Sequence, residues 1–245
     1  MDIASLWDFG DPAGSEHRFR AAAADAESPD RDVLLTQVAR ALALQDRFAA
    51  GHAVLDALTA SSAEVRVRTA LERGRLLRSA GQPADAMPFF ESAVDQADAA
   101  GLAALHVDAL HMVALVLPPE EQLAANELAL SVARESEDLA ARNWDASLLN
   151  NIGMVHADAG DWDAALVAFK DALRARERIG DDRLIREARW MIAWTLRHLG
   201  RTSEALEMQR ALRAEHRAAG TSDTYVDEEI ALLEADGPTG ASEHP

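Results

Sequence analysis

The stretch that decides the fold is NNIGMVHADAGDWDAALVAFKDAL, residues 150–173. Its small and large apolar residues fall three or four positions apart, which places them on one face of a helix. Gly160 interrupts this spacing, and glycine readily takes the left-handed conformation that ends a helix. Gly153 before the turn has no side chain, so a second helix carrying Phe169 can approach it closely. The stretch therefore predicts two antiparallel helices joined by a tight turn.

Weaker copies of this spacing occur elsewhere in the chain. At intervals of 35–40 residues, the turn position is held by Asp46, Gly81, Glu120, Gly160 and Gly200. The third copy is degenerate, with Pro118 and Pro119 at the turn, and a half-unit around Pro12 precedes all the others. One helix pair cannot bury both of its faces, so a repeat of this length predicts helix pairs stacked in a row.

The repeated pattern resembles the tetratricopeptide repeat family, whose unit is a helix pair with a glycine turn and small residues facing a phenylalanine. The resemblance covers residues 10–213 and is strongest over 145–173. Because the intervals here approach 40 residues, the chain is most similar to longer-repeat variants, such as those of kinesin light chain and bacterial peptide-pheromone receptors. LLNNIG, residues 148–153, is similar to the first helix of those variants.

The resemblance implies an all-α, right-handed superhelical solenoid of antiparallel helix pairs, with about five repeats. The stripe of Val226, Ile230 and Leu233 in the acidic segment TYVDEEIALLEA, residues 224–235, predicts a closing helix. The expected divisions are an N-terminal half-repeat at 1–30, the solenoid at 31–220, a capping helix at 221–236 and a disordered tail at 237–245.

Composition restricts the partners. The formal net charge of −18 would on average repel nucleic-acid phosphates and anionic membranes, so we expect neither as a partner. No apolar run reaches the 18 residues typical of a membrane-spanning helix, and the N-terminus has no signal-peptide pattern. The chain contains no cysteine, and a cytoplasmic location is the simplest interpretation.

The sequence carries no recognised catalytic motif, whether HExxH, a P-loop, GxGxxG, GxSxG or CxxC. His106 and His111 are five residues apart, a poor spacing for binding one metal ion from a helix. His156 and Asp158 could act as an acid–base pair, but no nucleophile accompanies them. We therefore expect no enzyme activity, no cofactor and no metal site.

The family resemblance implies a concave groove lined by one stripe of the first helix of each pair. This stripe contains five arginines and two acidic residues, Asp158 and Glu187, so its net charge is +3 within an acidic chain. The guanidinium group is a planar fork of donors suited to carboxylates, so the stripe favours an acidic ligand. The alternative is that these arginines pair with acidic residues of neighbouring helices and loops.

Uncharged residues extend the predicted groove. An amide such as that of Asn150 or Asn151 could hydrogen-bond the backbone of an extended ligand, or instead a neighbouring helix. Trp190 and Trp194 lie one helical turn apart and could anchor an apolar ligand group, or pack against the closing helix. The predicted groove residues are Arg40, Arg68, Arg75, Arg78, Asn150, Asn151, Met154, Trp190, Trp194 and Arg197.

Two functions remain open from the sequence. The first is a protein–protein interaction scaffold that holds a peptide or acidic segment of a partner in the concave groove. The alternative is a self-assembling structural protein, for example a homodimer, with its acidic C-terminal segment in its own or a neighbour's groove. Tyr225, Ile230 and Leu233 would be the apolar contacts of that segment.

Overall fold

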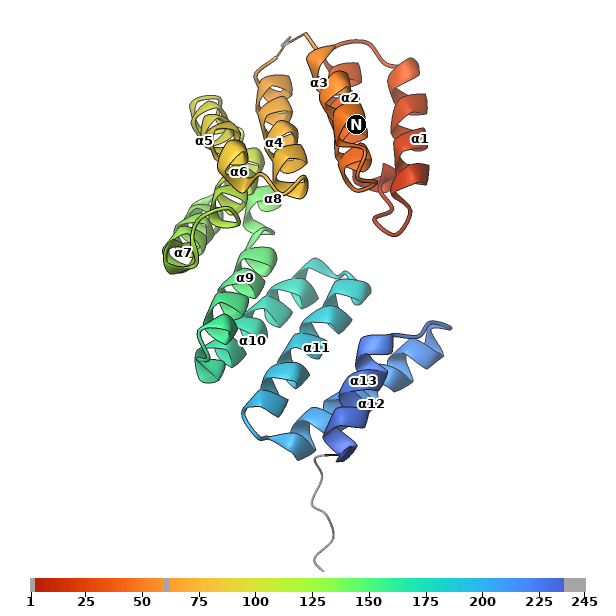
Figure 1. Cartoon of the computed structure of the whole chain (residues 1–245), viewed down its shortest axis with the longest axis vertical. Helices are drawn as coiled ribbons and strands as arrows, with labels where there is room; N and C mark the ends of the chain where they lie inside the picture. The colour runs from red at the N-terminus through yellow and green to blue at the C-terminus, as the bar shows by residue number, and fades with distance from the viewer. Residues whose placement is uncertain (1–2, 60–61, 236–245) are drawn as a thin grey trace, which may run out of the picture. The chain divides into compact units, whose positions relative to one another are not determined.

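The computed structural model describes residues 3–59 and 62–235, and within these ranges all regular secondary structure is helical. The helices follow one another in series (Figure 1). They form two compact units, Met1–Trp144 and Asp145–Pro245, and the boundary falls inside the range predicted for the solenoid. In the described part of the chain, no helix combines the length and the apolar character that crossing a membrane requires.

The first unit, called unit 1 below, consists of one leading helix, three helix pairs and two short helices, one at each end. Its elements are η1 (Ala4–Leu6), α1 (Pro12–Ala24), α2 (Asp30–Ala43), α3 (Phe48–Asp56), α4 (Ala63–Ser79), α5 (Pro83–Ala99), α6 (Ala103–Ala114), α7 (Pro119–Glu135) and α8 (Leu139–Arg142). The pairs are α2 with α3, α4 with α5, and α6 with α7. Phe19 of α1 and Phe90 of α5 are fully buried and form the centres of two core clusters.

The second unit, unit 2, contains two helix pairs and a closing helix. Its elements are α9 (Asp145–Asp158), α10 (Trp162–Ile179), α11 (Asp182–His198), α12 (Thr202–Ala218) and α13 (Thr224–Ala235). The pairs are α9 with α10 and α11 with α12, and α13 packs on α12 and α11. The predicted closing helix is confirmed, since Val226, Ile230 and Leu233 of α13 are each at most 3% exposed.

The quoted stretch forms the predicted helix pair, α9 and α10. Gly160 takes φ +77°, a left-handed conformation that glycine adopts without steric cost. The side chain of Asp161 then accepts a hydrogen bond from the backbone N–H of Ala164 and caps α10. A Cβ on Gly153 would lie only 2.5 Å from Cε1 of Phe169, so the glycine allows the two helices to approach each other closely.

The prediction that the third turn lies at Glu120 is wrong. Helix α6 ends at Ala114 and α7 begins at Pro119, so Glu120 lies in the first turn of α7 and residues 115–118 make the connection. Proline is favoured in the first turn of a helix, where its missing N–H costs no hydrogen bond. The sequence prediction also missed the short helix α8, and the predicted tail at 237–245 lies outside the described residues.

Candidate functional site

In unit 1 the predicted groove arginines lie around a buried ion-pair network. Arg75 of α4 contacts Glu72 at 2.5 Å, one helical turn earlier, and also pairs with Asp108 of α6. Glu72 and Asp108 are 2% and 6% exposed, so Arg75 neutralises two carboxylates that water hardly reaches. This network links the second helix pair to the third. The contacts of Arg75 are thus those expected if its role is structural.

The other three arginines of this group differ from Arg75 in their surroundings. The guanidinium carbon of Arg40 lies 5.8 Å from the ring centroids of both Trp7 and Phe9, a cation–π arrangement. Arg68 pairs with Glu64 at 2.8 Å within α4. Arg78 is exposed at the end of α4, and no described carboxylate forms an ion pair with it. As ligand contacts, all four arginines stay predictions.

His111 of α6 gives unit 1 a pH dependence. Burial, reinforced by the charges of Arg75, Arg78 and Arg40, lowers the pKa of His111 to about 4, although Asp108 opposes the shift. In the unfolded chain this pKa would be about 6.5, so the unfolded state binds more protons between these values. The free energy of unfolding should therefore be highest above pH 6.5 and fall by up to about 3 kcal/mol as the pH drops towards 4.

Urea unfolding at a series of pH values checks this prediction. His111→Gln should flatten the loss of stability in that pH range, whereas His17→Gln, at an exposed position of α1, should leave it unchanged. If both variants show the slope of the original protein, His111 does not remain neutral in the folded state.

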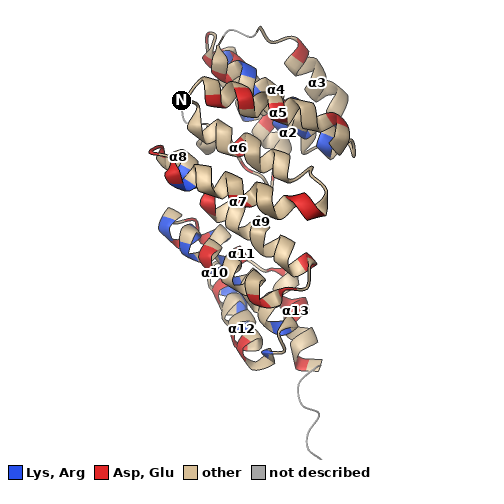
Figure 2. Ribbon diagram, turned by 90° about the vertical axis from the view of Figure 1, so that its left-hand side faces the viewer, with Lys and Arg blue, Asp and Glu red and all other residues tan. Residues whose placement is uncertain are grey.

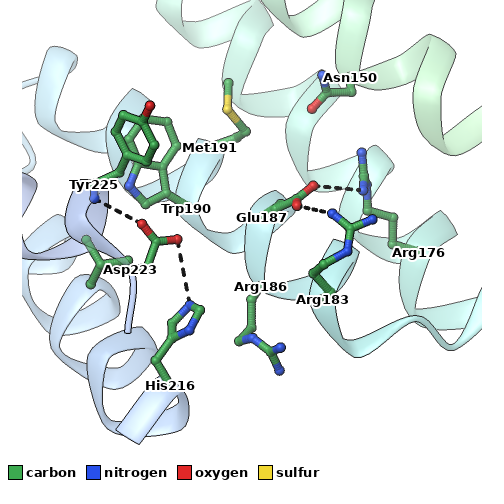
Figure 3. Close-up of a pocket in the computed structure, with 11 residues that line it drawn as sticks. Asn150, Arg176, Arg183, Arg186, Glu187, Trp190, Met191, His216, Asp223 and Tyr225 are labelled. Atoms are coloured by element: carbon green, nitrogen blue, oxygen red, sulfur yellow. Dashed lines mark hydrogen bonds and ion pairs between the residues drawn. The ribbon is translucent and has the colours of Figure 1, made fainter. Parts of the chain in front are cut away.

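Unit 2 contains a cleft of about 630 Å³ lined by residues of all five of its helices and of the α12–α13 loop. Figure 3 shows Met191 of α11 beside Trp190 and Tyr225, whereas Asn150 of α9 lies apart from them, above Arg176. The lining residues are Asn150, Arg176, Arg183, Arg186, Glu187, Trp190, Met191, His216, Asp223, Tyr225 and Val226. Clefts of this volume with an apolar wall and a few polar groups are typical of ligand sites.

The charged groups of this cleft are unevenly paired. Glu187 lies 3.9 Å from Arg176 and also pairs with Arg183, so one carboxylate serves two guanidinium groups. His216 lies 3.8 Å from Asp223 on the opposite side (Figure 3). Arg186 forms no ion pair with any residue in the described ranges. With His216 neutral, the cleft carries a net charge of +1, and Arg186 is its unpaired cation.

Three donors on residues that line this cleft are buried without an acceptor among the described residues. They are the Nε atoms of Arg176 and Arg186 and the indole Nε1 of Trp190. A buried donor without an acceptor costs about 1–3 kcal/mol, more when the group is charged. Burial also lowers the pKa of Arg176, with Glu187 opposing the shift, yet an arginine remains protonated in such a site. The lining thus has more hydrogen-bond donors than acceptors, which favours a ligand that supplies acceptors.

Comparison with known proteins identifies the repeats. Residues 144–214 match the family model described as tetratricopeptide repeat. This segment carries tetratricopeptide repeats. No characterised protein in the curated set matches the sequence. The matched segment contains α9, α10 and α11, which provide seven of the eleven residues that line the cleft.

Solved structures show the same fold at low sequence identity. Nearly identical TPR-like repeats of a Podosopora anserina kinesin light chain give a TM-score of 0.59 at 14% identity, covering 80% of this chain and 99% of that one. The quorum sensor NprR from B. thuringiensis gives a TM-score of 0.62 at 16% identity, covering 93% of this chain and 64% of that one. A Rap protein complexed with Competence and Sporulation Factor gives a TM-score of 0.60 at 13% identity, covering 92% of this chain and 69% of that one. The predicted all-α repeat fold is confirmed.

The predicted groove residues of α9 and α11 in unit 2 have different surroundings. Asn150 and Trp190 line the cleft. Met154 and Trp194 pack against the core, and the Trp194 ring contacts Trp162 edge to face with centroids 5.1 Å apart. The Nδ2 atom of Asn151 is buried without a partner among the described residues.

Arg197 of α11 connects this helix to the closing helix α13 of unit 2. Its guanidinium group donates two hydrogen bonds, of 2.8 and 2.9 Å, to the carboxylate of Glu229 in α13. Glu229 is 6% exposed, so the pair is largely shielded from water. These contacts match the alternative that the sequence left open, in which groove arginines pair with acidic residues of neighbouring helices.

Sequence reasoning missed most of the polar wall of the cleft. Arg176 belongs to the second helix of its pair, and Arg183 and Arg186 lie beside the groove stripe of α11. Tyr225 was predicted as a contact of a C-terminal segment inserted in a groove, not as a residue that lines one. A search for metal sites among the described residues finds no cluster of three or more His, Asp or Glu side chains. The arrangement offers hydrogen-bond donors and apolar surface, which suit binding.

Proposed function

We propose that this chain is a protein-interaction scaffold that binds an acidic peptide segment of a partner protein in the cleft of unit 2. The observation that carries the proposal is Arg186, a half-buried guanidinium group without a carboxylate partner in a cleft with an apolar wall. A carboxylate can accept hydrogen bonds from such a group, and charge-assisted bonds of this kind are stronger than neutral ones. The net charge of the cleft contrasts with the chain's −18.

The comparisons support the proposal through the fold. One structure of similar fold is a Rap protein complexed with Competence and Sporulation Factor, and another is a quorum sensor. A fold of this type can therefore bind another factor. Figure 2 shows basic and acidic residues interspersed on the helices of unit 2, so selectivity for an acidic segment would come from the cleft itself.

An array of random dodecapeptides probed with the intact protein tests this function. The protein should capture acidic peptides, and Arg186→Gln should lower their capture about tenfold, because a hydrogen bond to a charged group contributes about 1.5–3 kcal/mol. Arg174→Gln removes the same charge from an exposed position of α10 that pairs with Asp171, and should leave capture unchanged. Capture that ignores peptide charge, or that Arg186→Gln does not weaken, would refute the proposal.

Self-assembly is the second candidate. It is favoured by Tyr225 and Leu232 of α13, which are 66% and 50% exposed although the apolar stripe of Val226, Ile230 and Leu233 on the same helix is buried. In this structure α13 packs on α11 and α12 of its own unit. A mass in solution that rises with protein concentration, and that Leu232→Asp returns to one chain, would support this candidate over peptide binding.

A further inference from the structure

The cleft of unit 2 has two chemically different halves. Its apolar half contains Trp190 and Met191 of α11 together with Tyr225 and Val226 of α13. The Trp190 and Tyr225 rings meet nearly edge to face, with centroids 6.3 Å apart and planes at 71°. Tyr225 is 66% exposed, so much of its surface is uncovered. The rings therefore offer contact area for one bulky apolar side chain.

The polar half lies one helical turn earlier on α11. Arg186 and Trp190 are four residues apart in the same helix, so they share a face and their Cβ atoms are about 6 Å apart. Figure 3 shows the Arg186 guanidinium group apart from the pairs made by Glu187 and by Asp223. A ligand that fills the apolar half can thus place a carboxylate at Arg186 if its two groups lie on the same side of the ligand.

In an extended peptide, side chains two residues apart point to the same side and are separated by about 6.6 Å, whereas adjacent side chains point to opposite sides. Arg186 and Trp190 share one face of α11, which matches the first case. We infer that the cleft recognises an extended segment in which a bulky apolar residue and an aspartate or glutamate are separated by one residue. The apolar side chain contacts Trp190 and Tyr225, and the carboxylate accepts hydrogen bonds from Arg186.

This inference rests on the proposed function and makes Tyr225 a specificity-determining residue supplied by the closing helix. Tyr225 lies beside Trp190 only when α13 is packed on the unit. Val226, the next residue, is 2% exposed in the α12–α13 contact. One half of the ligand site is thus built by a helix outside the segment that matches the tetratricopeptide repeat family. The site needs both the repeats and their closing helix.

Selection of phage-displayed random dodecapeptides on the intact protein tests the inference. The original protein should enrich an apolar residue two positions from an acidic one, about tenfold over the unselected library, because burying a large apolar side chain is favourable. Tyr225→Ala should keep the acidic residue and lose the apolar one, whereas Arg186→Gln should do the reverse. Leu232→Ala, at an exposed position of α13 outside the cleft lining, should preserve the pattern.

The outcomes separate the inference from the function on which it rests. Enrichment of acidic residues with no apolar residue at that spacing would overturn the two-point ligand and leave an acidic-peptide scaffold. Enrichment of apolar and acidic residues three or four positions apart would overturn the extended ligand, because that spacing belongs to a helix. No enrichment of acidic peptides at all would overturn both. Tyr225 is largely exposed, so its variant should fold, and its helical circular dichroism checks this.

Discussion

Replacing Arg75 with leucine is expected to lower the free energy of unfolding by about 3–5 kcal/mol, because it leaves the buried carboxylates of Glu72 and Asp108 without their counter-ion. The side chain of Arg75 is 11% exposed, so water cannot replace the lost charge. Urea unfolding followed by circular dichroism measures the loss. Arg78→Leu, at the exposed end of the same helix, is the matched control and should change the value by less than about 0.5 kcal/mol.

The pH dependence of this variant adds a second signature. In the folded protein, burial raises the pKa of Asp108. The charge and hydrogen bond of Arg75, together with the charge of Arg40, outweigh this effect, so the pKa is lowered. The resulting stability is present above the ordinary pKa of an aspartate and is lost as the pH falls through the lowered value. Without Arg75 the upward shift of the Asp108 pKa is opposed only by the charges of Arg40 and His111, so Arg75→Leu should lose less stability on acidification than the original protein. If Arg75→Leu is as stable as Arg78→Leu but captures fewer peptides, Arg75 is a ligand contact.

This contrast shows what a repeat pattern can and cannot predict. The position of Arg75 on the groove stripe follows from local helical spacing, but its partner Asp108 lies 33 residues away on another helix. The sequence alone therefore predicted that Arg75 could bind a ligand, although the packing of the helices pairs it with a carboxylate. The same holds for Arg197, whose partner Glu229 is 32 residues later in the closing helix.

The fold was more predictable than the cleft because its signals are local. Gly153 and Phe169 lie within one helix pair, and the turn at Gly160 needs only a left-handed residue. The prediction failed where this local signal was weak, at the third repeat, where prolines replace the glycine. In the cleft, Asn150 and Trp190 followed from the repeat register.

Tyr225 and Arg176 did not follow from the register. Their positions depend on how α13 docks and where α10 ends, which no spacing within a single repeat specifies. The cleft lining is therefore a property of packed neighbouring helices, and it became visible only in three dimensions.

Replacing Phe169 with alanine should also lower the free energy of unfolding by about 3–5 kcal/mol, because the ring is 1% exposed and its removal leaves a cavity between α9 and α10. Hydrogen exchange measured by mass spectrometry on the intact chain should locate the lost protection in unit 2. Val167→Ala, two residues earlier and 62% exposed, should have little effect. Equal losses in the two variants would show that the Phe169 ring does not hold the helix pair together.

A double-mutant cycle shows whether Gly153 and Phe169 act as a pair. Gly153→Ala alone should destabilise the protein by about 1–3 kcal/mol, since its Cβ would lie 2.5 Å from the ring and force the helices apart. With Phe169→Leu already present, the ring is gone, and the same substitution should cost less by about 0.5–3 kcal/mol. Additive losses would contradict this coupling. A positive coupling would mean that the small residue of α9 is needed because α10 carries a phenylalanine, which is why the two recur together as Gly74 and Phe90 in unit 1.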